Sequence, residues 1–125
     1  MIYVEKEENR TIFKVTGDVT ANEIMMQVVQ YVDGEPTDTV LWNFTDASKV
    51  KITTMEMKGI ADSLKKTATD RTTRKVALVG SKSINLGLGK LFVAFAQLAG
   101  LQGTYQAFRD MNHAIEWLED SSNDQ

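Results

Sequence analysis

The segment Arg74–Lys90, RKVALVGSKSINLGLGK, decides how the chain is organised because it joins a buried strand to a helix through a short polar turn. The run Lys75–Gly80 is almost continuously apolar, which is typical of a strand covered on both faces. Apolar spacing from about Leu86 to Ala99 predicts a helix, and Gly100 is suited to end it. A buried strand that leads into a helix indicates an α/β fold.

The glycines of this segment raise the question of a phosphate site. A P-loop needs a glycine, four further residues and then Gly-Lys-Ser/Thr. If Gly89–Lys90 is the Gly-Lys pair, Ile84 stands where the first glycine belongs and Leu91 where the hydroxyl belongs. The dinucleotide spacing G-x-G-x-x-G fails as well. We therefore predict that Gly87 and Gly89 shape the entry to an apolar helix.

Capping boxes indicate where two further helices begin. Thr20 is followed three residues later by Glu23, and Thr53 by Glu56. Apolar patterning and turn residues predict the remaining elements. The expected strands are Ile2–Lys6, Thr11–Gly17, Thr39–Phe44 and Thr104–Phe108, and the expected helices run from Thr20 to about Tyr31, from Thr53 to about Ala68 and onward from Asp110.

The resulting order is ββαβαβαβα. An opening hairpin followed by alternating helices and strands predicts an α/β sandwich with a mixed, mostly parallel sheet of about five strands and about four helices. With 125 residues the chain is long enough for one core. We expect a single domain over residues 1–120 and a flexible acidic tail at 121–125.

Composition excludes several classes of function. A net charge of −3 offers no electrostatic footprint for nucleic acid. The chain has no cysteine and one histidine, so thiolate sites and histidine metal clusters are excluded. No apolar run is long enough to cross a bilayer, and we expect a cytoplasmic protein. The sequence assigns no catalytic, cofactor-binding or metal-binding residue.

Two segments carry a family resemblance. The stronger comprises KVALVG at 75–80 and YQAFRDMNHAIEWLED at 105–120, and the weaker is IFKVTGDVTANEI at 12–24. Together with the element order, they resemble the SpoIIAA-like family, which is grouped with STAS domains and the lipid-binding CRAL-TRIO (Sec14-like) domains. The resemblance implies a non-enzymatic regulatory or protein-interaction module that forms a homodimer and has a regulatory protein partner. The alternative is a carrier or sensor of a small apolar, lipid-like ligand in a pocket under the third helix.

The resemblance also raises the question of phosphorylation. Anti-sigma-factor antagonists of the STAS class carry a phosphorylated serine in an Asp-Ser-x-Gly motif at the start of the second helix. Here Thr54 falls near the place of that serine, and Glu56 stands where glycine is expected. The motif is absent, Glu56 would repel a phosphate, and Thr53 is explained by helix capping. Thr53 and Thr54 are therefore only candidate phosphosites.

Polar residues follow the predicted parallel strands. Ligands of open α/β sheets bind beyond the carboxyl ends of such strands, so a ligand or partner site is expected at this rim. Its candidate residues are Asp46, Ser48, Ser81 and Asp110. Two of them also have simple structural explanations, because Asp46 suits a turn and Asp110 suits a helix cap. His113 is expected to be exposed.

A basic stretch follows the second predicted helix. Cations near a helix C-terminus suit the helix dipole and are usually solvated. We expect a solvated surface, or a patch for an acidic partner, formed by Lys65, Lys66, Arg71, Arg74 and Lys75.

The third predicted helix has an apolar arc wider than one face of a sheet needs. Three interpretations stay open for this helix: core packing, a subunit interface and the wall of an apolar pocket. Val93 lies between Lys90 and Gln97 on the polar side, so it is expected to face outward. The candidate interface or pocket residues are Leu88, Phe92, Val93, Phe95 and Ala96.

Overall fold

The computed structural model describes residues 1–67 and 73–120. The predicted order ββαβαβαβα and the predicted α/β sandwich are confirmed in these residues. The strands are β1 (Ile2–Lys6), β2 (Arg10–Thr20), β3 (Thr39–Lys51), β4 (Lys75–Val79) and β5 (Thr104–Phe108). The helices are α1 (Ala21–Asp33), α2 (Thr54–Thr67), α3 (Ser83–Ala99) and α4 (Met111–Glu119). The predicted tail at 121–125, Ala68 and Arg71 lie outside the described residues.

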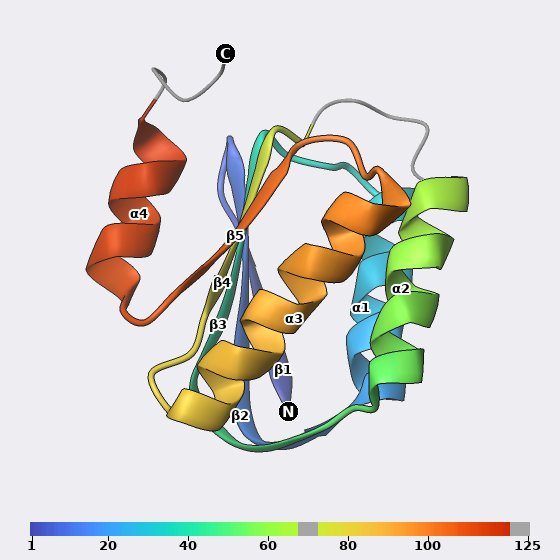
Figure 1. The fold of residues 1–125 in the computed structure, drawn as a ribbon. Helices are drawn as coiled ribbons and strands as arrows, with labels where there is room; N and C mark the ends of the chain where they lie inside the picture. Colours follow the sequence, from blue (N-terminus) through green and yellow to red (C-terminus); the bar gives the residue numbers. More distant parts are fainter. Residues whose placement is uncertain (68–72, 121–125) are drawn as a thin grey trace.

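The strands form one mixed sheet in the order β1-β2-β3-β4-β5. The first pair is antiparallel and the other three pairs are parallel. Each parallel connection advances the sheet by one strand in the same direction. Because such crossovers share one hand, their helices belong on one face of the sheet. Figure 1 shows α1, α2 and α3 on that face and α4 alone on the opposite face.

Helix starts follow the predicted local signals. The Thr20 side chain accepts a hydrogen bond from the Glu23 backbone N–H at 3.3 Å, and the Glu23 carboxylate accepts from the Thr20 N–H at 3.1 Å. At the start of α2, the Thr53 side chain accepts from the Glu56 backbone N–H at 3.1 Å, and the Glu56 carboxylate accepts from the Thr53 N–H at 2.8 Å. At the other end of α3, Gly100 adopts φ +70°, the left-handed conformation that lets a glycine end a helix.

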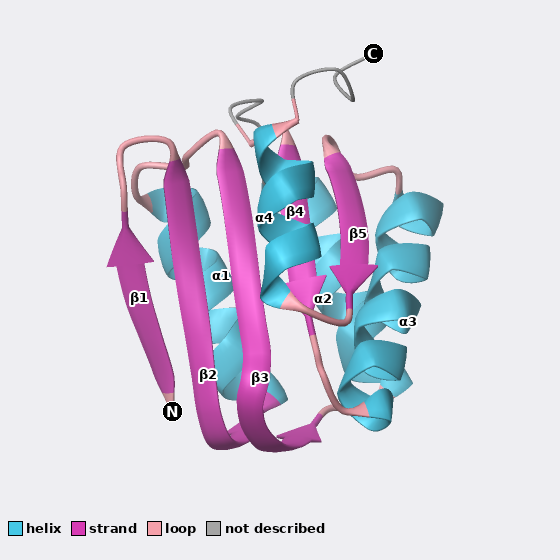
Figure 2. Ribbon diagram, turned by 90° about the vertical axis from the view of Figure 1, so that its left-hand side faces the viewer, coloured by secondary structure: helices cyan, strands magenta, loops and turns pink. Residues whose placement is uncertain are grey.

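Two strands are longer than predicted. β2 extends to Thr20 and β3 to Lys51, because residues beyond Lys14 pair with residues beyond Asn43 through two register shifts. The shifts interrupt simple alternation, so the apolar pattern does not reveal this part of the ladder. In Figure 2 the paired ends of β2 and β3 curve away at the carboxyl end of the sheet.

α3 begins earlier than predicted, at Ser83. Gly87 and Gly89 therefore lie inside the helix, and the prediction that they shape its entry is wrong. A Cβ at position 87 would meet nothing within 4 Å, and a Cβ at position 89 would lie 3.5 Å from the Ala107 Cβ, an ordinary contact. Neither glycine is required for space.

The sheet separates two apolar clusters. The larger cluster lies between the sheet and α1, α2 and α3, and its buried members are Phe13, Val15, Val19, Ile24, Val40, Trp42, Ala47, Ile60, Val76 and Leu78. The smaller cluster lies under α4 and contains Leu41, Ala77, Val79, Ala114 and Leu118. No described helix combines the length and apolar character that crossing a bilayer requires.

Candidate functional site

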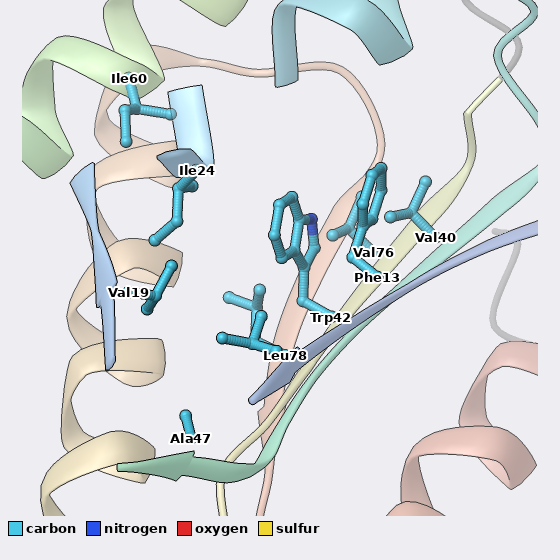
Figure 3. Packing of buried hydrophobic residues seen from close by; sticks show 10 residues of the cluster. Phe13, Val19, Ile24, Val40, Trp42, Ala47, Ile60, Val76 and Leu78 are labelled. Carbon is cyan, nitrogen blue, oxygen red and sulfur yellow. The ribbon is translucent and has the colours of Figure 1, made fainter. Parts of the chain in front are cut away.

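A cavity of about 210 Å³ lies within the larger cluster, between the sheet and the three helices that cover it. Its floor is aromatic. The Trp42 ring stacks on Phe13, with 4.2 Å between ring centroids, and on Phe44, with 5.9 Å. Figure 3 shows Trp42 and Leu78 projecting from the sheet toward Ile24 and Ile60 on the helices. These side chains make a wide apolar surface that faces the cavity.

Each covering helix contributes to the roof. α1 supplies Ile24, Val28, Tyr31 and Val32, α2 supplies Met57, Ile60, Leu64 and Lys65, and α3 supplies Asn85, Leu88, Gly89 and Phe92. The edge strand β5 adds Tyr105, whose ring centroid lies 6.1 Å from that of Phe92. The cavity is thus bounded by elements that are far apart in the sequence.

The polar groups of the cavity differ in how well they are satisfied. The Tyr31 hydroxyl donates to the Thr37 carbonyl, accepts from the Thr37 N–H, each at 3.0 Å, and hydrogen-bonds the Thr73 hydroxyl. Burial, and secondarily the nearby Tyr31, raises the pKa of Tyr105 to about 12, so its phenol is neutral. The Asn85 amide nitrogen is buried and has no hydrogen-bond partner among the described residues.

The space is large for an unfilled core. The space is partly open to solvent, so the cost of a closed cavity, about 24 cal/mol per Å³ or about 5 kcal/mol for 210 Å³, is an upper limit on the packing that it forgoes. That amount is comparable with the whole stability of a small domain, about 5–15 kcal/mol. A ligand that fills the space would recover part of this energy, so the arrangement is suited to binding an apolar molecule.

The candidate residues of the third helix differ in their surroundings. Leu88 and Phe92 line the cavity. Val93 is half-buried against the larger cluster and Ala96 is 1% exposed, so the prediction that Val93 faces outward is wrong, and Ala96 is unavailable to a partner. The error has a physical cause: α3 packs against α2 as well as the sheet, so a second side of the helix is covered. Phe95 is half-buried and lies outside the cavity lining.

The predicted rim does not gather into one site. Asp46 and Ser48 lie within β3 rather than after it, because the strand continues to Lys51. Asp46 forms an exposed ion pair with Lys14 at 3.5 Å. Ser81 is exposed in the turn before α3. No hydrogen bond or ion pair in the described part of the chain joins any two of the four rim residues, Asp110 included.

Asp110 instead forms the predicted helix cap. Its carboxylate accepts from the His113 backbone N–H at 2.9 Å and contacts the His113 ring nitrogen Nδ1 at 2.7 Å. The backbone and side-chain hydrogen bonds from His113 lower the pKa of Asp110. The hydrogen bond and the charge of Asp110 raise the pKa of His113, which is exposed as predicted. The pair is explained by helix capping.

The threonines at the start of α2 and the acidic side chains form no binding site of their own among the described residues. Thr53 and Thr54 are both exposed, and the Thr53 hydroxyl is engaged in the capping box. Their phosphorylation stays a prediction. Within residues 1–67 and 73–120, no cluster of three or more His, Asp or Glu side chains is arranged to hold a metal ion.

Sequence reasoning missed most of the residues that make the cavity. The sequence pattern predicts ordinary core positions for Phe13, Trp42 and Tyr31. It predicts no role for Asn85. One signal was available for Asn85: it is a polar residue beside Leu86 and Leu88 in an otherwise apolar helix. A polar residue on the inner side of a helix is unusual unless it has a partner.

Comparisons with known proteins agree with this architecture. No protein-family model and no curated protein matches the sequence. Among solved structures, the chain is similar to the anti-sigma factor antagonist SpoIIAA in its unphosphorylated form, with a TM-score of 0.58 and 11% sequence identity. The alignment covers 94% of this chain and 97% of the SpoIIAA chain. The relation to CRAL-TRIO domains stays a prediction. At this identity the similarity shows the fold alone, and the chain has a SpoIIAA-like α/β fold.

Proposed function

We propose that this protein is a non-enzymatic binding module that holds a small apolar ligand between its sheet and α1, α2 and α3. The observation that carries the proposal is the cavity of about 210 Å³ with its stacked aromatic floor. Aromatic and aliphatic walls with few polar groups are typical of small-molecule sites. This is the carrier or sensor alternative that the sequence left open.

The size of the cavity limits the ligand. An apolar cavity of about 150 Å³ in another protein holds benzene. A space of 210 Å³ therefore suits a substituted single ring or a short acyl chain rather than a two-chain lipid. The space is partly open to solvent and is walled by the sheet and three helices, so most of a ligand's surface would be buried.

The non-enzymatic part of the proposal rests on the arrangement of reactive groups. The carboxylates Asp46 and Asp110 engage separate local partners, Lys14 and His113, and neither lines the cavity. A general acid and base would have to meet at one bound substrate. The cytoplasmic location expected from the sequence is retained as part of this proposal.

Native mass spectrometry of the purified protein tests ligand binding. We expect a fraction of the chains to carry one extra mass of about one to two hundred daltons, given the volume available. After extraction of that molecule, added ethylbenzene should bind at one site per chain. A chain that is bare as purified and that binds no ethylbenzene at its solubility limit would refute the proposal.

A second function, self-association, is favoured by the outer face of α3. Ile84 and Leu98 are 71% and 83% exposed, and Leu91 between them is half-buried. The three residues repeat at heptad spacing, so they form one stripe along the helix.

This stripe is self-complementary. If two copies of α3 pack antiparallel about Leu91, Ile84 of each copy faces Leu98 of the other. The same symmetry sets Phe95 against Gly87, so that a large side chain meets a small one. We therefore propose a homodimer through this outer face, in place of the interface centred on Val93. A regulatory protein partner, as the SpoIIAA resemblance implies, would compete for the same stripe.

Replacing Leu98 with glutamate should test the dimer. Facing Ile84 of the second copy, the charge would be buried without a partner, and the dimer should dissociate at least tenfold more readily. Sedimentation equilibrium measures the change, and Val29→Glu on α1, where Val29 is 48% exposed, is the matched control. If the wild-type chain is a monomer at high micromolar concentration, or if Leu98→Glu leaves a dimer intact, self-association through this stripe is wrong.

A further inference from the structure

We infer that Asn85 is the polar anchor of the cavity and that it selects a ligand carrying one neutral oxygen group, an alcohol or a carbonyl, on an apolar body. This inference rests on the proposed binding function, which it makes more specific. Asn85 lines the cavity, is 6% exposed, and has an amide nitrogen with no hydrogen-bond partner in the part of the chain that the structure describes.

The backbone that carries the amide is closely packed. Gly80, which follows β4, lies so near Asn85 that a Cβ at position 80 would be 2.9 Å from the Asn85 main-chain carbonyl carbon. The residue also lies in the first turn of α3, where backbone hydrogen bonds fix it to the helix. A hydrogen-bonding group that projects from a fixed backbone and has no partner among the described residues is suited to recognition of a ligand.

The surroundings of Asn85 indicate the chemistry of the ligand group. Lys82 caps α3 without a side-chain hydrogen bond to the helix, so the positive end of the helix dipole is close to Asn85 and favours an oxygen atom there. The Lys82 ammonium at this end donates to the Ala47 carbonyl at 2.8 Å, and Lys82 does not line the cavity. Among the described residues that line the cavity, Lys65 alone is charged, and its ammonium donates to the Gly100 carbonyl at the opposite end of α3.

These constraints favour a neutral oxygen over a carboxylate. A carboxylate placed at Asn85 would be taken from water into an apolar cavity beside one amide, while Lys65 and Lys82 donate to the backbone carbonyls of Gly100 and Ala47. A hydroxyl or carbonyl needs only the hydrogen bond that the amide can make. The body of the ligand would then lie over the Trp42 ring, in contact with Phe92 and Leu78.

Two ligands of similar size distinguish the contribution of the Asn85 amide to binding from that of the apolar cavity. Benzyl alcohol and ethylbenzene differ only in that a hydroxyl replaces a methyl group. We expect the wild-type chain to bind benzyl alcohol, and Asn85→Leu to weaken that binding about tenfold while leaving ethylbenzene affinity unchanged or higher. Isothermal titration calorimetry measures both affinities. Asn112→Leu, an exposed asparagine on α4, is the matched control and should change neither.

The outcomes distinguish the two proposals. If both probes bind and Asn85→Leu leaves the ratio of their affinities unchanged, the anchor is wrong and the cavity function stands. If neither probe binds the wild-type chain, both proposals are overturned. Should Asn85→Leu fail to fold, Asn85→Ser provides the second variant: it removes the amide and shortens the side chain, and it should still weaken benzyl alcohol binding relative to ethylbenzene.

Discussion

Replacing Lys75 with methionine is expected to lower the free energy of unfolding by about 3 kcal/mol, because it removes charge-assisted hydrogen bonds to two partly buried carbonyls. Lys75 is 1% exposed on β4, an interior strand of the sheet. Its ammonium donates to the Trp117 carbonyl at 2.7 Å and to the Asp120 carbonyl, and it lies 5.1 Å from the Trp117 ring centroid. It therefore holds the C-terminal end of α4 against the sheet.

Methionine keeps the length and apolar stem of lysine, so the change isolates the ammonium. The last turn of α4 has no basic residue of its own, and Lys75 supplies the positive charge that its helix dipole favours. Urea unfolding, followed by circular dichroism, gives the change in stability, and Trp117 fluorescence should report a loosened α4. The control is Lys66→Met at an exposed position of α2, expected to change stability by less than about 0.5 kcal/mol. Equal stability of Lys75→Met and wild type would show that the hydrogen bonds contribute nothing net.

Replacing leucine with phenylalanine is expected to have opposite effects on the two faces of the sheet. Leu78 lines the cavity, so Leu78→Phe should fill empty space and stabilise the ligand-free protein by about 1 kcal/mol. Leu41 is 1% exposed in the cluster under α4, where its neighbours Ala77, Val79, Ala114 and Leu118 are also buried. Leu41→Phe should overpack that cluster and destabilise the protein by about 1–3 kcal/mol.

Ligand binding should also differ between the two variants. Because Leu78→Phe occupies volume that the ligand needs, ethylbenzene affinity should fall at least tenfold, whereas folded Leu41→Phe should bind ethylbenzene as wild type does. Urea unfolding measures the stability of each variant, and calorimetric titration measures its affinity for ethylbenzene. If Leu78→Phe destabilises the protein as much as Leu41→Phe, the space beside Trp42 is already filled by side chains, and the binding function loses its basis.

Local patterns in the sequence predicted the framework of the fold well. The capping boxes at Thr20 and Thr53 and the helix stop at Gly100 depend on hydrogen bonds between residues a few positions apart. The strand Thr104–Phe108 matched its predicted bounds. Patterning failed where pairing is irregular, as in the extension of β3 that contains Asp46, because register shifts remove the alternation on which it depends.

The candidate site was predicted less well. The sequence left an apolar pocket under the third helix open as one interpretation, and of the five residues named for it Leu88 and Phe92 line the cavity. The cavity itself depends on how far three helices stand from the sheet. That distance reflects the volumes of side chains from seven elements, which no local pattern reports.

The sequence by itself determined the order of elements, the parallel character of the sheet and the ends of most helices, since these follow from periodicity, caps and short-range hydrogen bonds. Only the tertiary structure decided which polar residues are inside. Lys75 was expected on a solvated surface, yet it is buried because its partner Trp117 lies 42 residues away. Asn85 became a candidate anchor because folding buries its amide without an acceptor. Burial of a polar group is set by contacts distant in sequence, and those form only when the layers pack together.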